Sequence, residues 1–498
     1  MSGRLAAIHA LPYNQRQPRG AVPAGGEAEG VEQATADVVV VGAGFAGLVA
    51  AVRAQELGAR VALVEKTPVA PSWSNSRLSG GSFSAAGLSP LAPTAQIVAK
   101  LLQDTQGAAS EPLARAWAAA CPRVYHWLRA HGTRWVNLRG QLVMAPVRPN
   151  RRGAQWRGRG PDVTLRRLQA RFLAQGGQYW GDTAACELRQ VHGRVVGLVA
   201  RRLTADTRLE FACGAVILAD GGFQANPALL RRYANVTRPE RLFLRGAGTG
   251  GGDALLMALG AGAKLAHGEA IFGHLLHADA VRNAQLCHFP FVDRIANSAL
   301  VVGPDGRRFA DEGLGALAVA NRIARLPDPG ATWLVFDRRL WETVGRYNQA
   351  VPPNPNLLLA GARLEVAADA AALAGRIGVP ADALAATLGE YNTALAADKG
   401  RALPVPRGGT APPLGSPLIA VPLVVGITYT LGGPLVDAHA QVVDGAERPI
   451  PGLYAAGLTA GGLAGGPRPA TAGGIGTALP LGFLAGEWAA RGAVLGAG

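Results

Sequence analysis

The segment Gly42–Gly47 constrains the fold of this chain more than any other, because it fits the pattern G-x-G-x-x-G. It follows a strand-like run, Val38–Val41, and opens a segment with helical spacing, Ala46–Leu57. A second strand-like run, Arg60–Val64, ends at the acidic Glu65. A strand, a glycine turn, a helix and a second strand with an acidic end are typical of the β-α-β unit that binds dinucleotides.

The glycines of this motif have separate physical tasks. Gly42 permits the tight turn after the strand, Gly44 lets the backbone approach a pyrophosphate, and Gly47 lets the helix pack closely on the sheet. The start of the helix offers free N–H groups to phosphates, and Glu65 can accept hydrogen bonds from both ribose hydroxyls. We therefore expect nucleotide contacts from Gly42, Gly44, Phe45, Ala46, Gly47, Glu65 and Lys66.

The length and charge of the chain limit the remaining choices. A chain of 498 residues is long enough for two domains, and its 49% hydrophobic and 17% charged residues are typical of a globular protein. The net charge of +15 is nearly all arginine, with the densest cluster between Arg148 and Arg159. Because Trp156 is the one aromatic residue within this cluster, it gives little support to a nucleic-acid partner.

The cysteines and the hydropathy pattern indicate a compartment. The four cysteines, Cys121, Cys186, Cys213 and Cys287, are scattered without a C-x-x-C pair. We therefore expect no metal, no iron–sulfur cluster and no disulfide framework, which favours the reducing cytoplasm. The N-terminus lacks an apolar signal-peptide core, and three prolines interrupt the uncharged stretch 415–436, so we expect no transmembrane segment.

Hydrophobic periodicity predicts alternating strands and helices after a flexible tail at residues 1–36. The predicted helices are Pro112–His131, Asp162–Gln175, Asp253–Gly260, Ala316–Ile323, Ala367–Ile377, Ala381–Ala397 and Thr477–Arg491. The predicted strands are Arg194–Arg201, Leu209–Phe211, Ala215–Leu218, Ala299–Val302, Leu418–Val425, Ala440–Val443 and Leu453–Ala456.

Six segments, in this order and spacing, resemble the fumarate reductase/succinate dehydrogenase flavoprotein family. These segments are Val38–Gly47, Ser74–Gly81, Val216–Asn226, Ile427–Asp437, Leu453–Gly462 and Gly473–Ala490. The branch most similar in appearance contains the FAD-dependent tricarballylate dehydrogenase, and 3-ketosteroid Δ1-dehydrogenase is more distant. The resemblance implies an α/β fold in which a Rossmann-like FAD-binding domain (37–268 and 417–498) carries an inserted capping domain (269–416).

The same resemblance implies which residues hold FAD. The loop over the flavin would be Asn75–Gly81, the strand end near it Ala219–Phe223, and Gly473–Thr477 would open the final helix. No histidine occurs from Val69 to Leu88, so the family's covalent histidyl attachment is absent and FAD would be noncovalent. Many members have Glu where this chain has Leu458. The implied contacts are Asn75, Ser76, Arg77, Ser79, Gly80, Gly81, Ala219, Asp220, Gly221, Gly457, Gly474, Thr477, Ala478 and Leu479.

The family also implies candidates for substrate binding and catalysis, each with a plainer alternative. Arg468 lies in a loop where fumarate reductases bind a substrate carboxylate, although an arginine-rich chain also places arginines on its surface. Tyr429 falls at or next to the position where family members have a substrate-binding histidine, and Thr430 follows it. The alternative role for Tyr429 is that of a tyrosine packed in the core.

Arg308 and Glu312 match the family's cap motif but also fit a structural ion pair. The position of the family's proton-donating Arg is Ala316 here, which leaves the proton-transfer residue unassigned. His288, with His274 and His277, falls where members often have a substrate-facing histidine, and a lone histidine is more often structural.

The resemblance implies a hydride transfer between flavin N5 and a carbon–carbon bond activated by a carboxylate or ketone. The substrate would be a small molecule, tricarballylate- or fumarate-like and anionic, and a separate protein or molecule would exchange electrons. One alternative is a ketosteroid-type desaturase or a flavin oxidase, although Ile419 replaces the tyrosine that ketosteroid dehydrogenases use. An alternative of another class, a nucleic-acid-binding flavoprotein, rests on the Arg148–Arg159 cluster alone.

Overall fold

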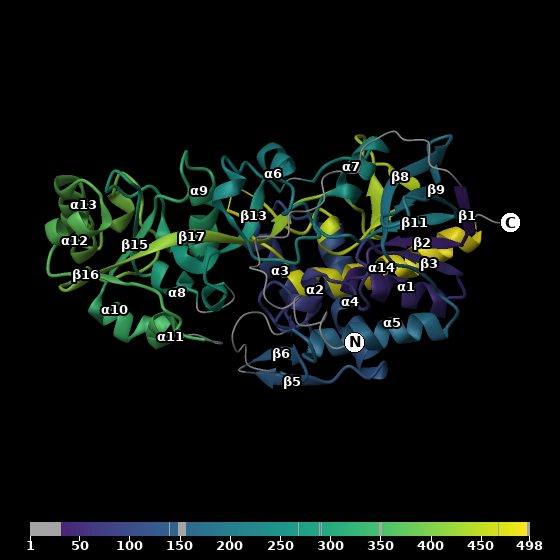
Figure 1. Ribbon diagram of the computed structural model, residues 1–498, viewed down its shortest axis with the longest axis horizontal. Coiled ribbons are helices and arrows are strands. Elements are labelled where there is room, and N and C mark those ends of the chain that lie inside the picture. Colours follow the sequence, from purple (N-terminus) through teal and green to yellow (C-terminus); the bar gives the residue numbers. More distant parts are fainter. Residues whose placement is uncertain are drawn as a thin grey trace.

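The protein has two lobes that lie side by side along its longest axis (Figure 1). The computed structural model describes residues 31–138, 140–147, 156–266, 268–287, 289, 291–347, 351–466 and 468–495. One lobe, here the nucleotide lobe, is built from both ends of the chain, and the other, the cap lobe, from its middle. Each lobe has its own large cluster of buried hydrophobic side chains.

A six-stranded sheet forms the centre of the nucleotide lobe, in the order β18-β19-β11-β2-β3-β7. The strands from β19 to β7 run parallel, and β18 is antiparallel to β19. Strands β2, β3 and β11 consist wholly of buried apolar residues, as expected for a parallel sheet covered on both faces. The bounds are β2 Val38–Val41, β3 Val61–Val64, β7 Gln178–Trp180, β11 Ala215–Leu218, β18 Gln441–Val443 and β19 Pro449–Ala455.

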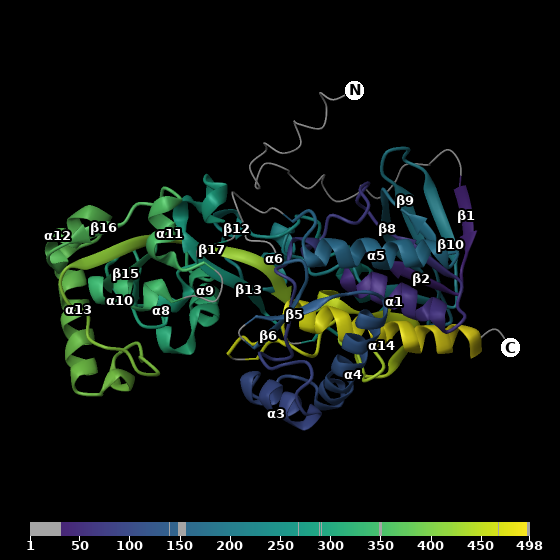
Figure 2. The ribbon, with the colours of Figure 1, turned by 90° about the horizontal axis from the view of Figure 1, so that it is seen from below.

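Helices run side by side across this sheet (Figure 2). Helix α1 packs against both α14 and α5, and α14 also packs against α4. Small residues allow the closest approach, because a Cβ atom on Gly482 of α14 would lie 2.5 Å from the Ala46 carbonyl oxygen of α1. The bounds are α1 Phe45–Glu56, α3 Thr94–Asp104, α4 Glu111–Ala130, α5 Gly160–Ala174 and α14 Gly474–Leu495.

Two smaller sheets complete the nucleotide lobe. One has the order β1-β10-β9-β8 and the other β4-β6-β5. The prediction of a flexible tail through residue 36 is wrong for residues 31–35, because they pair in parallel with β10 as strand β1. The bounds are β1 Val31–Thr35, β4 Ser82–Phe83, β5 Trp135–Leu138, β6 Gln141–Met144, β8 Thr183–Val191, β9 Arg194–Arg202 and β10 Arg208–Ala212.

The cap lobe surrounds a mixed sheet in the order β12-β17-β15-β14, with β13 and β16 also paired to β17. Its strands are β12 Phe243–Leu244, β13 Ala270–His277, β14 Leu300–Val302, β15 Trp333–Asp337, β16 Glu365–Ala367 and β17 Leu418–Leu431. Its helices are α8 Asp293–Ala296, α9 Ala316–Ala324, α10 Arg338–Glu342, α11 Pro353–Leu359, α12 Ala370–Ile377 and α13 Ala381–Ala396, while α6 Pro227–Tyr233 and α7 Asp253–Gly260 lie before it in the chain.

Strand β17 joins the two lobes and is longer than the sequence predicts. The predicted strand ends at Val425, but the structure continues it to Leu431. Its first half pairs with β15 and β16, and its second half pairs with β13 and β12. These neighbours supply hydrogen-bond partners beyond Gly426, and the strand therefore delivers Tyr429 to the junction of the lobes.

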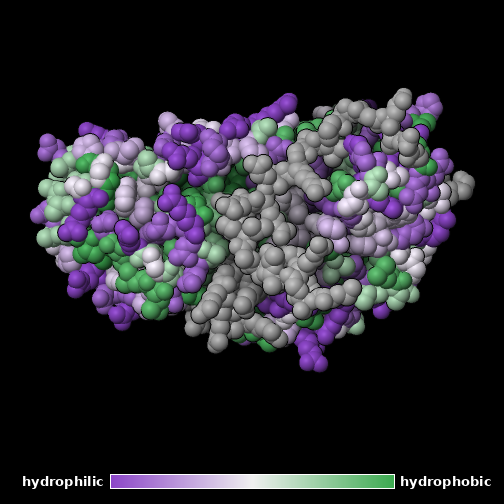
Figure 3. Space-filling model, viewed as in Figure 1, coloured by the Kyte–Doolittle hydropathy of each residue, from purple (hydrophilic) through white to green (hydrophobic). Residues whose placement is uncertain are grey.

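The α/β class and the Rossmann-like arrangement are confirmed, whereas the exact domain boundaries stay a prediction. On the face shown in Figure 3, apolar residues gather over part of the cap lobe, and hydrophilic residues are spread over both lobes. Within the described part of the chain, no helix is long and apolar enough to cross a membrane.

Candidate active site

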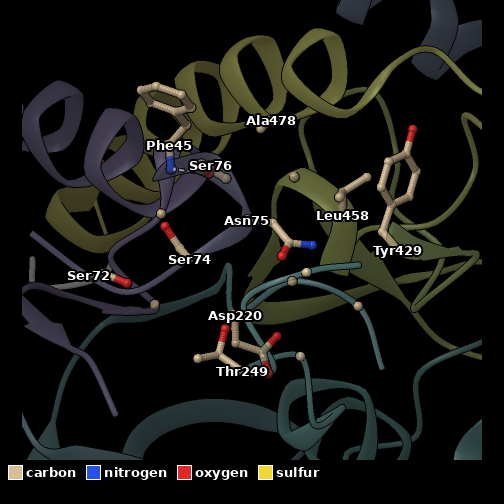
Figure 4. Close-up of a pocket in the computed structure, with 18 of the residues that line it drawn as sticks. Phe45, Ser72, Ser74, Asn75, Ser76, Asp220, Thr249, Tyr429, Leu458 and Ala478 are labelled. Atoms are coloured by element: carbon tan, nitrogen blue, oxygen red, sulfur yellow. Dashed lines mark hydrogen bonds between the residues drawn. The ribbon is translucent and has the colours of Figure 1, made fainter. Parts of the chain in front are cut away.

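A large cavity lies where the nucleotide lobe meets the cap lobe. Its lining comes from the turn after β2, the end of β3, the loop around α2 (Asn75–Leu78), the ends of β11 and β17, and the start of α14. Its atom-free volume is about 1570 Å³, open solvent at the mouth included. Figure 4 shows side chains from several elements converging on it.

The glycine turn packs so closely that side chains are excluded at two positions. Gly42 has φ +98°, and a Cβ atom there would lie 2.6 Å from the Ala219 carbonyl oxygen. A Cβ atom on Gly47 would lie 1.8 Å from the Gly42 carbonyl oxygen. At Gly44 the nearest atom to such a Cβ would be the Ser76 hydroxyl oxygen at 3.2 Å, a tight contact, and Gly44 itself lines the cavity.

Glu65, at the end of β3, is held in one orientation by three donors. The Ala43 backbone N–H donates to its Oε2 at 2.8 Å, and the Thr67 backbone N–H and hydroxyl donate to its Oε1 at 2.8 and 2.7 Å. Because Oε1 already accepts two bonds and Oε2 only one, Oε2 keeps a further lone pair for a ligand hydroxyl. Glu65 is buried within the protein but lines the cavity.

Beside Glu65 lies a cluster of three more charged groups. Lys66 Nζ donates to Asp253 Oδ2 at 2.8 Å, and the nearby carboxylates keep the pKa of Lys66 raised although burial alone would lower it. Burial raises the pKa of Asp220 to about 6, partly offset by Lys66. Asp220 accepts hydrogen bonds from the Ala254 backbone N–H and the Thr459 hydroxyl, so it bridges three segments.

The loop around α2 (Asn75–Leu78) is fastened to the cap-facing strands. Asn75 Nδ2 donates to the Thr428 carbonyl at 2.8 Å, and its Oδ1 accepts from the Ala247 N–H at 2.7 Å. Ser76 caps the start of α1, since its hydroxyl accepts from the Phe45 N–H at 3.0 Å. These bonds fix the loop over the middle of the cavity (Figure 4).

The far end of the cavity is aromatic and apolar. Tyr429 stacks on Phe272 and its hydroxyl lies 3.4 Å from the Thr471 hydroxyl, close to the start of α14. Burial raises the pKa of Tyr429, so this phenol is neutral at physiological pH. Leu458 lies beside Tyr429 (Figure 4), and Phe289 also lines the cavity.

Most predicted cofactor contacts line this cavity. They are Gly42, Gly44, Phe45, Ala46, Glu65, Lys66, Asn75, Ser76, Ser79, Gly80, Ala219, Asp220, Gly221, Gly457, Gly474 and Ala478. The others do not line it: Gly47, Arg77, Gly81, Thr477 and Leu479.

The physical reasons for these exceptions differ. Arg77 turns into the protein, where its Nε donates to Asp162 at 2.7 Å and its guanidinium lies 3.9 Å from the Trp156 ring. Leu479 is fully buried in the hydrophobic core, and Thr477 is buried in the first turn of α14. A Cβ atom on Gly47 would contact the Gly42 carbonyl oxygen, and one on Gly81 would contact the Pro161 ring, so both glycines pack against the protein itself.

Several residues predicted to act on substrate lie away from the cavity lining. Thr430 is buried, and its hydroxyl accepts from the Phe223 N–H at 3.1 Å. Arg308 and Glu312 form an ion pair of 2.6 Å inside the cap lobe, with side-chain exposures of 6% and 0%. Arg468 is exposed and donates to the Leu314 carbonyl at 3.0 Å. His288 lies outside the described residues.

Two further histidines from the prediction have identifiable partners. His274 Nδ1 lies 2.6 Å from Asp293 Oδ2, and its ring stacks on Phe291 at 4.2 Å. His277 is fully buried, and its Nε2 lies 3.0 Å from the Arg363 carbonyl oxygen, which indicates a structural role. Within the described residues, no group of three or more His, Cys, Asp or Glu side chains could hold a metal ion.

The sequence analysis missed part of the lining. The missed residues with polar or aromatic side chains include Ser72, Ser74, Arg159, Gln224, Arg245, Thr249, Asp253, Phe289 and Thr428. The glycine run before Asp253 was a signal for a backbone that approaches a ligand closely. Arg245 and Phe289 had no local signal, because only the pairing of β12 and β13 with β17 brings them to the cavity.

Comparison with known proteins agrees with this geometry. The family described as FAD binding domain matches residues 37–475. Fumarate reductase (cytochrome) of Shewanella frigidimarina is 27% identical over 482 residues, which cover 92% of this chain and 77% of that protein. The 4-oxocyclohexanecarboxylate 2-dehydrogenase of Sinomonas cyclohexanicum is 30% identical over 330 residues, 59% of this chain and 54% of that protein.

A solved structure shares the fold. The crystal structure of 3-ketosteroid Δ1-dehydrogenase from Sterolibacterium denitrificans has a TM-score of 0.70 with this chain at 20% identity, covering 92% of this chain and 99% of that one. At this identity the likeness concerns the fold alone.

The cavity itself fits FAD. Gly42 and Gly44 line the cavity with backbone, and the N-terminus of α1 next to them can meet phosphates. Gln224 is 5% exposed and lines the cavity, and its buried Oε1 has no hydrogen-bond partner within the protein, so a ligand donor can satisfy it. The chain therefore belongs to the FAD-binding domain family that includes the fumarate reductases, and it is an FAD-dependent oxidoreductase that acts on CH–CH groups.

Proposed function

We propose that this protein transfers a hydride between bound FAD and a carbon–carbon bond activated by a carboxylate or ketone. The observation that carries the proposal is the continuity of one cavity, from the glycine turn at Gly42 to the aromatic end at Tyr429 beneath the cap lobe. Both Shewanella fumarate reductase and the Sinomonas dehydrogenase are named for substrates with a carboxylate. FAD supplies a two-electron acceptor at this place when it is bound.

The chain's own residues would bind and orient both molecules. The start of α1 and Glu65 would hold the nucleotide half of the cofactor. Tyr429, a neutral phenol, would donate a hydrogen bond to a substrate oxygen rather than act as a base. Leu458 and Phe289 would exclude water from the bond that reacts.

A dehydrogenation also requires loss of a proton from the neighbouring carbon, and the reverse reaction requires its return. His274 does not line the cavity, so we assign this step to no residue of the described lining. Asp293 Oδ2 lies 2.6 Å from His274 Nδ1 and orients this ring, which is a candidate from the family resemblance alone. His288, which lies in the same region of the sequence, is the alternative from the family resemblance.

The manner of FAD binding and the compartment are also proposals. We expect noncovalent FAD, because no histidine lies in the loop of residues 69–88. The thiols of Cys121, Cys186 and Cys213 are free, which suits a reducing cytoplasm. The electrons would pass to or from a separate carrier, and the arginine-rich composition favours an anionic substrate.

One observation favours a ketosteroid-type desaturase as a second candidate. Phe289, Tyr429 and Leu458 line the cavity with apolar surface, and Phe272 stacks on Tyr429 outside the lining. An apolar steroid would suit that wall. The guanidinium of Arg245 in the same lining instead favours an anion.

An anaerobic spectral titration tests the proposal. The purified flavoprotein is mixed with carboxylates, cyclic ketones and a 3-ketosteroid, and the visible flavin band is followed. The proposal predicts that at least one carboxylate or ketone bleaches the band without oxygen. If the steroid alone bleaches the band, the ketosteroid-type desaturase replaces the proposed function. If no CH–CH donor alters the oxidised flavin and no acceptor alters the reduced flavin, the proposed function is refuted.

A further inference from the structure

Arg159 is a buried cation that lines the cavity. It is 8% exposed, and its guanidinium makes no hydrogen bond, ion pair or ring contact with the described residues. Burial lowers the pKa of Arg159, and no carboxylate lies close enough to raise it. Because a buried charge without a partner is costly, Arg159 indicates an anion that binds in the cavity and that the protein does not itself supply.

The other cations of the described lining already have partners. Lys66 Nζ donates to Asp253 Oδ2 at 2.8 Å, and the surrounding carboxylates raise the pKa of this lysine. Arg245 Nη1 donates to the Thr428 hydroxyl at 2.9 Å. Of the cations in the described lining, Arg159 is therefore the one whose side chain has no partner in the protein.

Arg159 is fastened to the loop that meets the start of α1. It directly precedes α5, and Asp162 in the first turn of α5 accepts a hydrogen bond from Arg77 Nε at 2.7 Å. Arg77 follows Ser76, whose hydroxyl accepts from the N–H of Phe45, the first residue of α1. This series of bonds brings Arg159 to the side of the cavity where the glycine turn opens α1.

Two serine hydroxyls line the same side of the cavity. Figure 4 shows Ser72 and Ser74 on the side where Phe45 begins α1. Ser72 is 2% exposed, and its hydroxyl makes no hydrogen bond with the described residues. The Ser74 hydroxyl accepts from the Arg77 N–H at 3.4 Å and keeps its own proton to donate. Hydroxyls, a helix N-terminus and a guanidinium are the donors that phosphate oxygens accept from.

We infer that Arg159 binds the pyrophosphate of FAD and that Ser72 and Ser74 donate to the same group. The negative charge of FAD lies on this pyrophosphate, and a planar guanidinium can donate two parallel hydrogen bonds to phosphate oxygens. The inference rests on FAD binding but not on the substrate, so it goes beyond the proposed function. It assigns the retention of the cofactor in part to a side chain outside the Gly42–Gly47 turn.

The test measures the dissociation constant of FAD for the flavin-loaded protein. Flavin released on dilution is followed by its fluorescence, without turnover. Arg159→Gln should raise the dissociation constant at least about tenfold, and Ser72→Ala should raise it severalfold. Added salt should weaken FAD binding more in the wild type than in Arg159→Gln, because salt screens the lost charge interaction.

A matched control comes from the same helix. Arg171→Gln removes an equal charge from α5, where Arg171 forms a partly exposed ion pair of 3.4 Å with Glu56. This variant should leave the dissociation constant of FAD unchanged. An equal loss of FAD affinity in Arg171→Gln would show that the net charge alone is responsible and would overturn the inference.

The variants of Arg159 should fold, because only its backbone bonds to the protein. Its N–H donates to the Trp156 carbonyl at 3.1 Å, and its carbonyl accepts from the Val163 N–H at 2.9 Å. If Arg159→Gln nevertheless does not fold, Arg159→Lys keeps the charge but loses the parallel hydrogen bonds. It should raise the dissociation constant of FAD about threefold, and an unchanged constant in Arg159→Lys overturns the inference.

The remaining outcomes separate this inference from the assignment of the cofactor. If Arg159→Gln binds FAD as tightly as the wild type, the inference is wrong although FAD binding stands. If this variant keeps its affinity for FAD but binds fumarate more weakly, as measured by perturbation of the flavin spectrum, Arg159 faces the substrate and the inference is also wrong. A folded wild-type protein that takes up no FAD would refute the cofactor assignment and the inference together.

Discussion

The phenol ring of Tyr429 lies face to face with the ring of Phe272, with centroids 4.6 Å apart and planes 5° apart. Phe272 belongs to β13, where the chain enters the cap lobe, and Tyr429 belongs to β17, where it leaves. The stack therefore joins the two crossings between the lobes at the edge of the cavity. Any change in the position of the cap lobe acts directly on this pair.

Replacing Tyr429 with Phe tests the hydroxyl separately from the stack. The variant keeps both rings, so flavin content should stay the same and the free energy of unfolding should change by less than about 1.5 kcal/mol. We expect kcat/KM to fall about tenfold, because a hydrogen bond to the substrate is lost. Stopped-flow reduction of the flavin measures this. An unchanged rate would show that Tyr429 serves only as a packing ring.

Replacing Gly47 with Ala tests the close packing behind the glycine turn. The new Cβ would lie 1.8 Å from the Gly42 carbonyl oxygen, which forces α1 away from the sheet. We expect the purified variant to lose bound FAD and to unfold at a lower temperature. The control is Gly389→Ala in α13, where a Cβ meets no atom within 4 Å. Its free energy of unfolding should rise by up to about 1 kcal/mol. Normal FAD content in Gly47→Ala would contradict the packing argument.

Replacing Glu312 with Gln tests the role of the cap ion pair. Glu312 is fully buried, pairs with Arg308 at 2.6 Å and lies 3.7 Å from Arg407, which is also fully buried. Removing this charge leaves two cations without their shared partner, which costs about 3–5 kcal/mol. Urea denaturation should show this loss. A stable variant with a slow flavin reduction would instead support the catalytic role that the family motif implies.

The pH dependence of stability should include a contribution from Glu56. Burial alone would raise the pKa of Glu56, but hydrogen bonds from His131, Trp127 and Arg53 lower it to about 2 from 4.5. The stabilisation is therefore complete above pH 4.5 and is lost as the pH falls towards 2. Glu56→Gln should lower the free energy of unfolding by about 2–3 kcal/mol at pH 7. It should also reduce the fall of that free energy as the pH drops below 4.5.

Urea denaturation at several pH values measures the effect of Glu56. The control is Glu342→Gln, which removes an exposed i,i+4 pair with Arg346 and should cost less than about 0.5 kcal/mol. If the free energy of unfolding falls equally with decreasing pH in wild type and in Glu56→Gln, the carboxylate contributes nothing to the pH dependence.

Local patterns predicted the parts of the fold that depend on local interactions. The strand Val38–Val41 and the helix Asp253–Gly260 have the predicted bounds, because apolar runs and helix-end residues mark them in the sequence. The extension of β17 beyond Val425 depends on partners from β12 and β13, which are far away in the chain. Strand β1 likewise exists through its pairing with β10.

The same distinction applies to the site. The glycine turn and Glu65 were predictable because the β-α-β unit is local in sequence. Arg77 was predicted from its loop, but its partner Asp162 lies 85 residues away and draws it out of the cavity. Arg245 and Phe289 carry no local motif, and their role in the lining follows only from the packing of the cap lobe on β17.

The most direct test of the central claim is the visible spectrum of the purified protein before and after acid precipitation. A flavin band should accompany the folded protein, and after precipitation the supernatant should contain FAD while the mass of the chain is unchanged. Flavin that stays with the precipitate would contradict noncovalent binding. A folded protein that neither carries FAD nor takes it up would contradict the account as a whole.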